Sequence, residues 1–209
     1  PGFRRTLIAR AVDFFNDEIY QLRSAEPTGG ELVRIDTPTD ASVSIHRDWL
    51  LIELRSDWHA GTGDYTAGSL LAADYEQFLD GTAELAVVFE PDEHTCLHQY
   101  AWTKDRLVMV TLADVASRVE IVTPGSWTRE PVRGLEPGSG ELRSTTIAAA
   151  DPAGDEIFLD SSGFLTPSTL LHGEAGGELT PIKQAPSFFD TAGLGVSPFF
   201  ATPADGTRA

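Results

Sequence analysis

A short segment near the middle of the chain carries residues that commonly bind metal ions. His94, Cys96 and His98 alternate with other residues, so in a β-strand all three would point to one face. Zinc is held tetrahedrally by cysteine and histidine, and Asp92 or Glu93 could supply a fourth ligand. The two histidines of an extended strand, however, would lie about 13 Å apart at roughly 3.3 Å per residue, too far for one ion. We therefore interpret the segment as a strand with a buried cysteine and two surface imidazoles, and we predict no metal site and no cofactor.

No motif in the chain identifies a catalytic nucleophile. The patterns G-x-S-x-G, H-E-x-x-H, G-x-x-x-x-G-K-[ST] and C-x-x-C are all absent from the sequence. The remaining histidines, His46, His59 and His172, have no sequence-adjacent partner, and a lone histidine is more often structural than a general base. We predict no catalytic residue and no cofactor-binding residue in this chain.

Two further residue groups suggest ligand binding. The four tryptophans Trp49, Trp58, Trp102 and Trp127 could form a stacking platform for a carbohydrate. Trp49 and Trp102 stand at the ends of expected strands and are explained more simply as core residues. The acidic run at 90–93 resembles a calcium site in composition but lacks the fixed spacing of a calcium-binding loop, so we interpret it as a solvated turn.

The charge of the chain excludes several classes of protein. Its 209 residues include 15 Lys and Arg against 32 Asp and Glu, a net charge of −17, and Arg4 and Arg5 are the only adjacent basic pair. Binding to nucleic acid or to an anionic membrane needs basic surface, so neither partner is expected. No run of 18 apolar residues could span a bilayer, whereas 41% hydrophobic residues provide ample material for a core. A single cysteine excludes an internal disulfide, and we expect a cytoplasmic location.

The elements that would position these residues follow a repeat. A polar pair containing aspartate, followed by a short apolar strand, occurs at Asp17, Asp48, Asp105 and Asp155, with spacings of 31, 57 and 50 residues. Two of these spacings are near the roughly 40–50 residues of a four-stranded propeller blade. An aspartate in such a turn can hydrogen-bond its own backbone, which gives a local reason for its recurrence.

Each unit predicts a set of short strands. In the unit at 41–90, Val43 and Ile45 alternate with serines before the marker strand, and two later strands are separated by a turn at Asp80 and Gly81. The later strands are expected at 69–75 and 84–89, those of the next unit at 97–102, 106–112, 118–122 and 127–132, and those of the last at 144–149, 155–159, 167–171 and 178–183. In the first unit only 32–36 fits after the marker strand, so either one strand is missing or its boundary is misplaced.

The composition favours an all-β fold. Helical patterns are nearly absent, although 72–79 could form one or two turns, and 19 Gly and 13 Pro punctuate the short strands. These features fit a sandwich, a barrel or a propeller. The blade-length repeat selects the propeller, because a sandwich needs no self-similar units of this size. We predict about four propeller blades, each of four antiparallel strands.

Two segments resemble a known family. The residues from Ser162 to Leu171 look like the S-F-L-[ST]-P strand in the last propeller blades of the prolyl oligopeptidase family of serine peptidases. The tail from Phe200 to Arg208 is similar to the S-x-D-G-T-[KR] turn with which that family's chain leaves the propeller. The resemblance covers nearly the whole chain, and it is closest from about Asp155 onward.

The resemblance implies a division of labour between domains. Such peptidases carry a Ser-Asp-His triad on an α/β-hydrolase domain, capped by a seven-bladed propeller whose tunnel excludes large folded substrates. It implies that residues 1–200 are a partial propeller domain, the later part of the ring, and that residues 201–209 begin the linker to a catalytic domain missing from this chain. The fragment would gate access by size, while its parent cleaves short proline-containing peptides through that domain.

A second hypothesis stays open beside the first. The chain could be a free-standing propeller or sandwich that binds a carbohydrate or a protein partner. Under the first hypothesis, four blades of a seven-bladed ring would leave apolar blade faces exposed, because isolated blades cannot bury their own faces. We therefore expect self-association through those faces or closure into a small ring.

Overall fold

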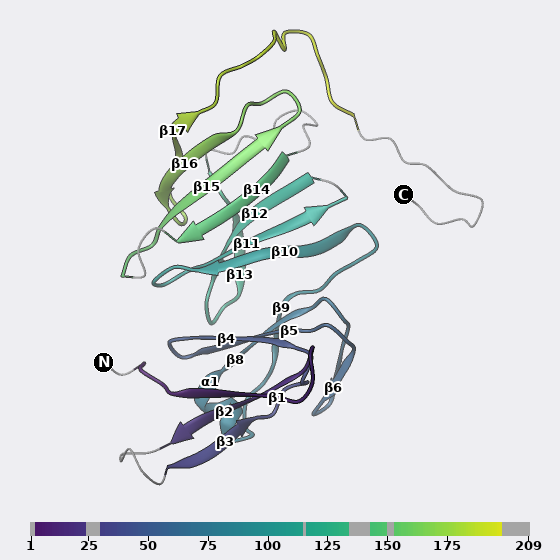
Figure 1. Ribbon diagram of the computed structural model, residues 1–209, viewed down its shortest axis with the longest axis vertical. Helices are drawn as coiled ribbons and strands as arrows, with labels where there is room; N and C mark the ends of the chain where they lie inside the picture. The colour runs from purple at the N-terminus through teal and green to yellow at the C-terminus, as the bar shows by residue number, and fades with distance from the viewer. Residues whose placement is uncertain (1–2, 24–29, 115, 134–142, 150–152, 198–209) are drawn as a thin grey trace, which may run out of the picture. The chain divides into compact units, whose positions relative to one another are not determined.

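The chain folds as a series of antiparallel sheets in two compact units. The structure, a computed structural model, describes residues 3–23, 30–114, 116–133, 143–149 and 153–197. The units comprise residues 1–97 and 98–209, and each is described by itself. Figure 1 shows the strands of each sheet side by side, each joined to the next by a short connection in most cases. The predicted all-β propeller architecture is confirmed.

The first unit holds two sheets and a small hairpin. A three-stranded sheet is formed by β1 (Leu7–Ala11), β2 (Asp17–Arg23) and β3 (Glu31–Ile35). A four-stranded sheet follows, in the order β4 (Ser42–His46), β5 (Trp49–Glu53), β8 (Leu70–Asp74) and β9 (Ala86–Phe89). Between β5 and β8 the chain makes a separate hairpin of β6 (Trp58–Ala60) and β7 (Gly63–Tyr65), and a short helix α1 (Tyr75–Leu79) precedes β9.

The second unit holds two four-stranded sheets. The first consists of β10 (Thr95–Trp102), which begins in the last residues of the first unit, β11 (Leu107–Ala113), β12 (Ala116–Thr123) and β13 (Thr128–Pro131), in that order. The second consists of β14 (Arg143–Ala149), β15 (Glu156–Gly163), β16 (Thr169–Glu174) and β17 (Thr180–Gln184). Every strand expected in these two sheets is present, with its ends shifted by only a few residues.

Each unit has its own core between facing sheets. In the first unit Ile35 of the three-stranded sheet packs with Leu50, Ile52 and Leu71 of the next sheet. In the second unit Val108, Val110 and Ile121 pack with a matching set of aliphatic residues from the β14–β17 sheet. The continuous apolar runs of β5 and β11 are buried on both strand faces, whereas in β15 buried and exposed residues alternate. These patterns follow the sequence, because a strand covered on one face needs apolar residues only at every second position.

Polar contacts also join the two sheets of the second unit. The side-chain amide of Gln99 on β10 donates to the carbonyl oxygen of Ile147 on β14 (2.8 Å) and accepts from its N–H (3.1 Å). Asp155, the last repeat marker, accepts hydrogen bonds from the Thr103 hydroxyl (2.6 Å) and the Asp105 N–H (2.7 Å). Those donors lie in the turn between β10 and β11. The carboxylate of Asp155, which directly precedes β15, thus connects the β14–β17 sheet to the turn between β10 and β11 in the preceding sheet.

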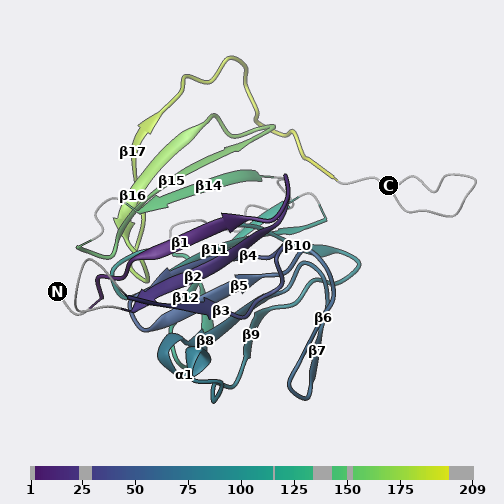
Figure 2. The same cartoon turned by 60° about the horizontal axis from the view of Figure 1, so that its bottom comes forward.

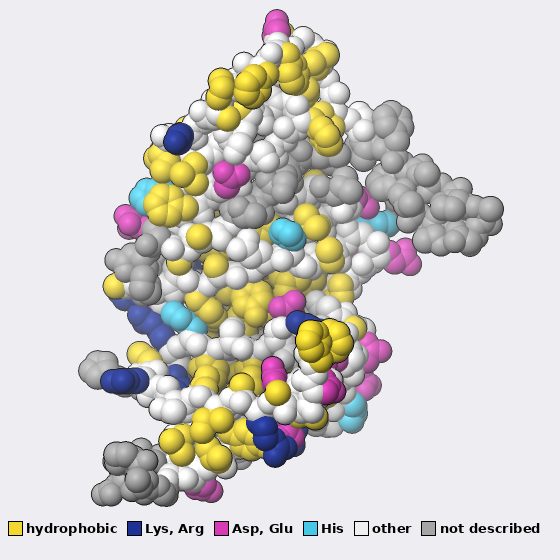
Figure 3. All heavy atoms as spheres, in the orientation of Figure 1, with side chains coloured by type: hydrophobic (Ala, Val, Ile, Leu, Met, Phe, Trp, Pro, Cys, Tyr) yellow, Lys and Arg dark blue, Asp and Glu magenta, His cyan; other side chains and the backbone are white. Residues whose placement is uncertain are grey.

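The three-stranded sheet has one face turned away from its neighbour. Ile19 and Ile35 point into the core, so the strand register puts Ile8, Leu22 and Leu32 on the opposite face. Ile8 is 40% exposed and Leu32 is 50% exposed. Figure 3 shows hydrophobic side chains at the surface over β2 and β3. We call the residues Ile8, Leu22 and Leu32 the outer face of the first sheet.

Charged residues continue the outer face toward the β1–β2 turn. Glu18 lies between Arg10 and Arg34, and its carboxylate also accepts a hydrogen bond from the Tyr20 hydroxyl at 2.8 Å. That hydrogen bond, together with the two arginines, lowers the pKa of the Glu18 carboxyl. The outer face therefore combines an apolar end with a cluster of paired charges.

The structure also shows where the expected elements differ. Among the described residues the first sheet has three strands, and its first strand, β1, was not among those expected from the sequence. The ambiguous segment at 72–79 is divided between the end of β8 and helix α1, and Asp74 caps the helix by accepting from the Gln77 N–H at 2.9 Å. The β6–β7 hairpin was not predicted. The expected linker at 201–209 and the tail motif lie outside the described residues.

Candidate functional site

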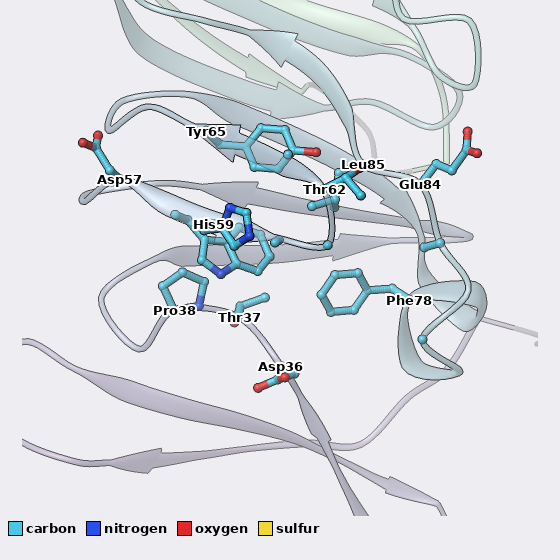
Figure 4. Close-up of a pocket in the computed structure, with 16 residues that line it drawn as sticks. Asp36, Thr37, Pro38, Asp57, His59, Thr62, Tyr65, Phe78, Glu84 and Leu85 are labelled. Atoms are coloured by element: carbon cyan, nitrogen blue, oxygen red, sulfur yellow. The ribbon is translucent and has the colours of Figure 1, made fainter.

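The first unit contains a hollow of about 970 Å³ beside the β6–β7 hairpin. Three segments line it: the loop after β3, the hairpin itself, and the stretch from α1 to the start of β9. Figure 4 shows the labelled side chains around this space, with Tyr65 and Phe78 on different sides of it and Thr37 and Pro38 opposite Tyr65. In Figure 2 the hairpin, labelled β6 and β7, is seen as a long loop extending from the rest of the first unit.

The hairpin is held by two cross-strand pairs. Trp58 pairs with Tyr65, and their ring centroids are 6.2 Å apart. His59 pairs with Asp64, with Nδ1 and Oδ1 separated by 2.7 Å, although both side chains are largely exposed. At Gly63 a Cβ would lie 2.6 to 2.8 Å from atoms of the Tyr65 ring. The glycine therefore lets the ring fold back over its own strand.

The base of the hairpin is closed by backbone hydrogen bonds. Leu54 donates to the carbonyl oxygen of Ser69 (2.9 Å) and accepts from the N–H of Gly68 (2.8 Å). Asp57 accepts from the N–H of Ala67 at 2.8 Å. These contacts fix where the hairpin leaves and rejoins the sheet, so the hairpin is anchored at its root while its tip is exposed.

Three aromatic rings give the hollow its apolar lining. Trp58, Tyr65 and Phe78 are each half-buried, and all three pack against the core of the first unit while facing the space. Phe78 is presented by helix α1, and Leu85 and Pro38 add aliphatic surface. The rings are therefore held in place by the core yet remain available to a ligand.

The charged residues of the lining are acidic. Asp36, Asp57 and Glu84 contribute carboxylates, and no lysine or arginine is among the lining residues. Asp36 makes one ion pair, with Arg34 at 3.8 Å, and its side chain is 89% exposed. Such an exposed pair is weak because water screens it. The hollow thus combines aromatic faces with negative charge. Its lining residues include threonine and tyrosine hydroxyls but no serine or cysteine.

The segment from His94 to His98, whose residue types resemble zinc ligands, leads into and forms the start of strand β10. Cys96 and His98 lie on β10 and are exposed, while Leu97 between them is half-buried. The expectation of a buried cysteine was therefore wrong, since this strand presents the opposite face to the interior. Asp92 accepts from the N–H groups of His94 (2.7 Å) and Thr95 (2.8 Å), and these bonds lower the pKa of its carboxyl. Among the described residues, no three His, Cys, Asp or Glu side chains are grouped to hold a metal ion.

The other candidate residues are dispersed. His172 stacks on Phe158, with ring centroids 4.8 Å apart, and lies 3.8 Å from Glu156. His46 lies on β4, and only His59 of the histidines lines the hollow. Trp58 is the one tryptophan in the lining, so the platform suggested by four tryptophans is reduced to one ring at this place. Glu90, Asp92 and Glu93 are exposed, as expected for a solvated turn.

The hollow was missed by reasoning from the sequence. One local indication existed, because Gly61, Thr62 and Gly63 stand between two aromatic residues in a pattern typical of a hairpin turn. The three lining segments, however, are separated by many residues, and only the fold brings them together.

Across the described residues, no helix is long and apolar enough to cross a membrane.

Comparisons with known proteins agree on one kind of relative. An uncharacterised peptidase of Sinorhizobium fredii is 32% identical over 206 residues, which are 95% of this chain and 28% of that protein. An uncharacterised peptidase of Rickettsia prowazekii is 25% identical over 94% of this chain and 27% of that protein. The chain thus spans less than a third of the length of these curated relatives. No protein-family model matches the chain.

Solved structures support the same fold. A post-proline cleaving enzyme from Rickettsia typhi superposes with a TM-score of 0.80 at 23% identity, over 98% of this chain and 30% of that one. Prolyl oligopeptidase B from Galerina marginata superposes with a TM-score of 0.64 at 13% identity, over 97% of this chain and 28% of that one. The peptidase relatives, the structural neighbours and the four successive sheets agree with one another: the chain is similar in sequence to proteins named peptidases and has the fold of part of the propeller of prolyl oligopeptidases.

Proposed function

We propose that this chain is the substrate-gating part of a serine peptidase that cleaves short proline-containing peptides. One observation carries the proposal: 95% of the chain aligns with a protein named a peptidase, yet occupies only 28% of it. The aligned part is built of propeller sheets, and its sequence has no motif for a nucleophile. In a protein of this kind the Ser-Asp-His triad would therefore lie in a different part of the polypeptide.

A gate must resist being pushed open by a folded substrate, and the contacts between neighbouring sheets favour such a role. Separating the two sheets of the second unit would break the paired hydrogen bonds of Gln99 with Ile147. It would also remove the two hydrogen bonds that Asp155 accepts from the preceding turn. Buried aliphatic residues from both sheets would be exposed to water at the same time. Flexible short peptides need no such separation to pass.

The test compares substrates of increasing size with the full-length protein. A blocked dipeptide chromogen ending in proline should be hydrolysed, and longer unstructured peptides with the same cleavage site should be hydrolysed more slowly. A folded protein displaying that sequence in a loop should be resistant. The 209-residue chain by itself should show no turnover. Equal cleavage of the folded protein would contradict gating, and turnover by the chain alone would contradict the location of the triad. Absence of activity in the full-length protein would favour the alternative of a binding module.

A further inference from the structure

We propose that the hollow beside the β6–β7 hairpin binds a positively charged peptide side chain, that of arginine or lysine. The inference concerns binding alone, so it can hold or fail independently of the proposed peptidase function. It depends on three properties of the hollow: its aromatic faces, the sign of its charge, and its size.

The aromatic faces suit a cation with an aliphatic stem. Trp58, Tyr65 and Phe78 present ring surface toward the space, and a cation within about 6 Å of a ring centroid is attracted by the negative face of the ring. The methylene groups of lysine or arginine would at the same time cover apolar surface. The first unit already uses this contact elsewhere, since the guanidinium of Arg5 lies 4.4 Å from the centroid of the Tyr75 ring.

The charge of the lining selects against other ligands. The carboxylates of Asp36, Asp57 and Glu84 come from three separate segments, and Figure 4 shows them apart from one another at the edges of the hollow, with those of Asp57 and Glu84 turned outward. The carboxylate of Asp64 already faces His59 across the hairpin. With no lysine or arginine in the lining, an anionic ligand would be repelled and a neutral one would gain no electrostatic attraction.

The size of the hollow argues for a side chain on a peptide and against a bare ion. A space of about 970 Å³ lies at the upper end of the range for small-molecule pockets, roughly 300–1,000 Å³. No group of His, Cys, Asp and Glu in the described part of the chain is placed to hold a metal. An extended peptide can put one long side chain among the rings while its backbone remains at the rim. The guanidinium of arginine can also lie flat against an aromatic ring, which makes arginine the better probe.

The experiment titrates the full chain with two matched peptides. The first is N-acetyl-Gly-Arg-Gly-Gly-amide, and the second replaces arginine with citrulline, which has nearly the same shape but no charge. Neither contains proline, so binding is measured apart from the proposed cleavage. The readout is the indole N–H resonance of Trp58, assigned by its loss in Trp58→Phe. The arginine peptide should shift this resonance saturably and bind about fivefold or more tightly than the citrulline peptide. Raising the salt from about 0.05 M to about 0.5 M should remove most of that difference.

Variants identify the charges involved. The double variant Asp36→Asn/Glu84→Gln keeps the shape of the lining and should weaken binding of the arginine peptide about threefold or more, with little effect on the citrulline peptide. Glu130→Gln, an exposed carboxylate on β13 outside the lining, is the matched control and should leave both affinities unchanged. Far-UV circular dichroism checks that each variant is folded.

Three outcomes would overturn the proposal. The first is an unshifted Trp58 resonance at high concentrations of the arginine peptide. The second is equal affinity for the citrulline peptide, which would indicate a neutral aromatic groove. The third is an arginine affinity that survives removal of the two carboxylates in a folded variant.

Discussion

The contact between Asp155 and the preceding turn predicts a measurable loss of stability. In Asp155→Ala the hydrogen bonds from the Thr103 hydroxyl and the Asp105 N–H, at 2.6 and 2.7 Å, would both be lost. A hydrogen bond to a charged group contributes about 1.5 kcal/mol or more, which partial exposure reduces to about 1 kcal/mol for each bond here. We expect the free energy of unfolding to fall by about 2 kcal/mol. Asp155→Asn retains an acceptor oxygen and should lose about half as much.

The pH dependence of this effect has a definite sign. Partial burial alone would raise the pKa of Asp155, but hydrogen bonds from Thr103 and Asp105 and the charge of Arg106 outweigh it and hold that pKa below its ordinary value. A carboxyl with a lowered folded-state pKa stabilises the fold above its unfolded pKa, and this stabilisation is lost as the pH falls through the folded value. The difference between the natural chain and Asp155→Asn should therefore be constant near neutrality and shrink below about pH 4.

The assay is urea unfolding followed by fluorescence, with the m-value checked for constancy. Asp160→Ala is the control, because this exposed carboxylate lies on β15, the strand that follows Asp155, and among the described residues it accepts from the Ser168 hydroxyl alone, at 3.1 Å or more. It should change the free energy of unfolding by less than about 0.5 kcal/mol. A double-mutant cycle with Thr103→Val should give a coupling energy near 1 kcal/mol. If Asp155→Ala were as stable as the control variant, the view that this aspartate fastens two sheets would be refuted.

Three further predictions concern packing and association. In Gly173→Ala the new Cβ would lie 2.6 Å from a backbone carbonyl oxygen and 2.9 Å from Leu179, so we expect a loss of about 2 kcal/mol in urea unfolding, and an unchanged midpoint would be inconsistent with that packing. In Gly63→Ala the new Cβ would lie 2.6 to 2.8 Å from atoms of the Tyr65 side chain, and the ring would have to shift, so we expect a loss of about 1 kcal/mol in stability and a lower affinity for the arginine peptide; unchanged affinity would show that the ring position is unimportant. We also propose that the outer face of the first sheet mediates self-association, because Leu32 is 50% exposed there. The unsubstituted chain should then sediment as an oligomer, and Leu32→Lys should lower its sedimentation coefficient. An unsubstituted chain that sediments as a monomer would rule this out.

Much of the strand arrangement could be predicted because its causes are local. Alternating residues such as Val43 and Ile45 place one strand face inward, and a short polar turn reverses the chain, so neighbours in sequence become neighbours in the sheet. The alternation alone does not determine which of the two strand faces is buried. In β10, Cys96 and Leu97 are both apolar enough to face inward, and only packing decides that Leu97 does.

The remaining features arise from contacts between distant residues. The strands β6 and β7 have three residues each, too few to show a period, and in each strand one exposed residue lies between two half-buried ones. The partners of Asp155 lie about fifty residues earlier, so its recurrence in the repeat was visible but its role between sheets was not. The hollow is formed by three segments, and the stretches 39–56 and 66–77 separate them in the sequence.

The β6–β7 hairpin is inserted between β5 and β8 in a way that would allow a different loop to take its place. The strands on either side of it, β5 and β8, remain hydrogen-bonded neighbours, and the ladder continues to Leu54 and Ser69 at the root. The pairing of β5 with β8 therefore needs no hydrogen bond from residues 55–67, although Trp58 and Tyr65 of this segment pack against the core. Because doubling the length of a flexible loop costs only about 0.6 kcal/mol in closure entropy, this position can accept loops of other lengths and sequences. Evolution or design can thus alter what this blade recognises without redesigning the blade.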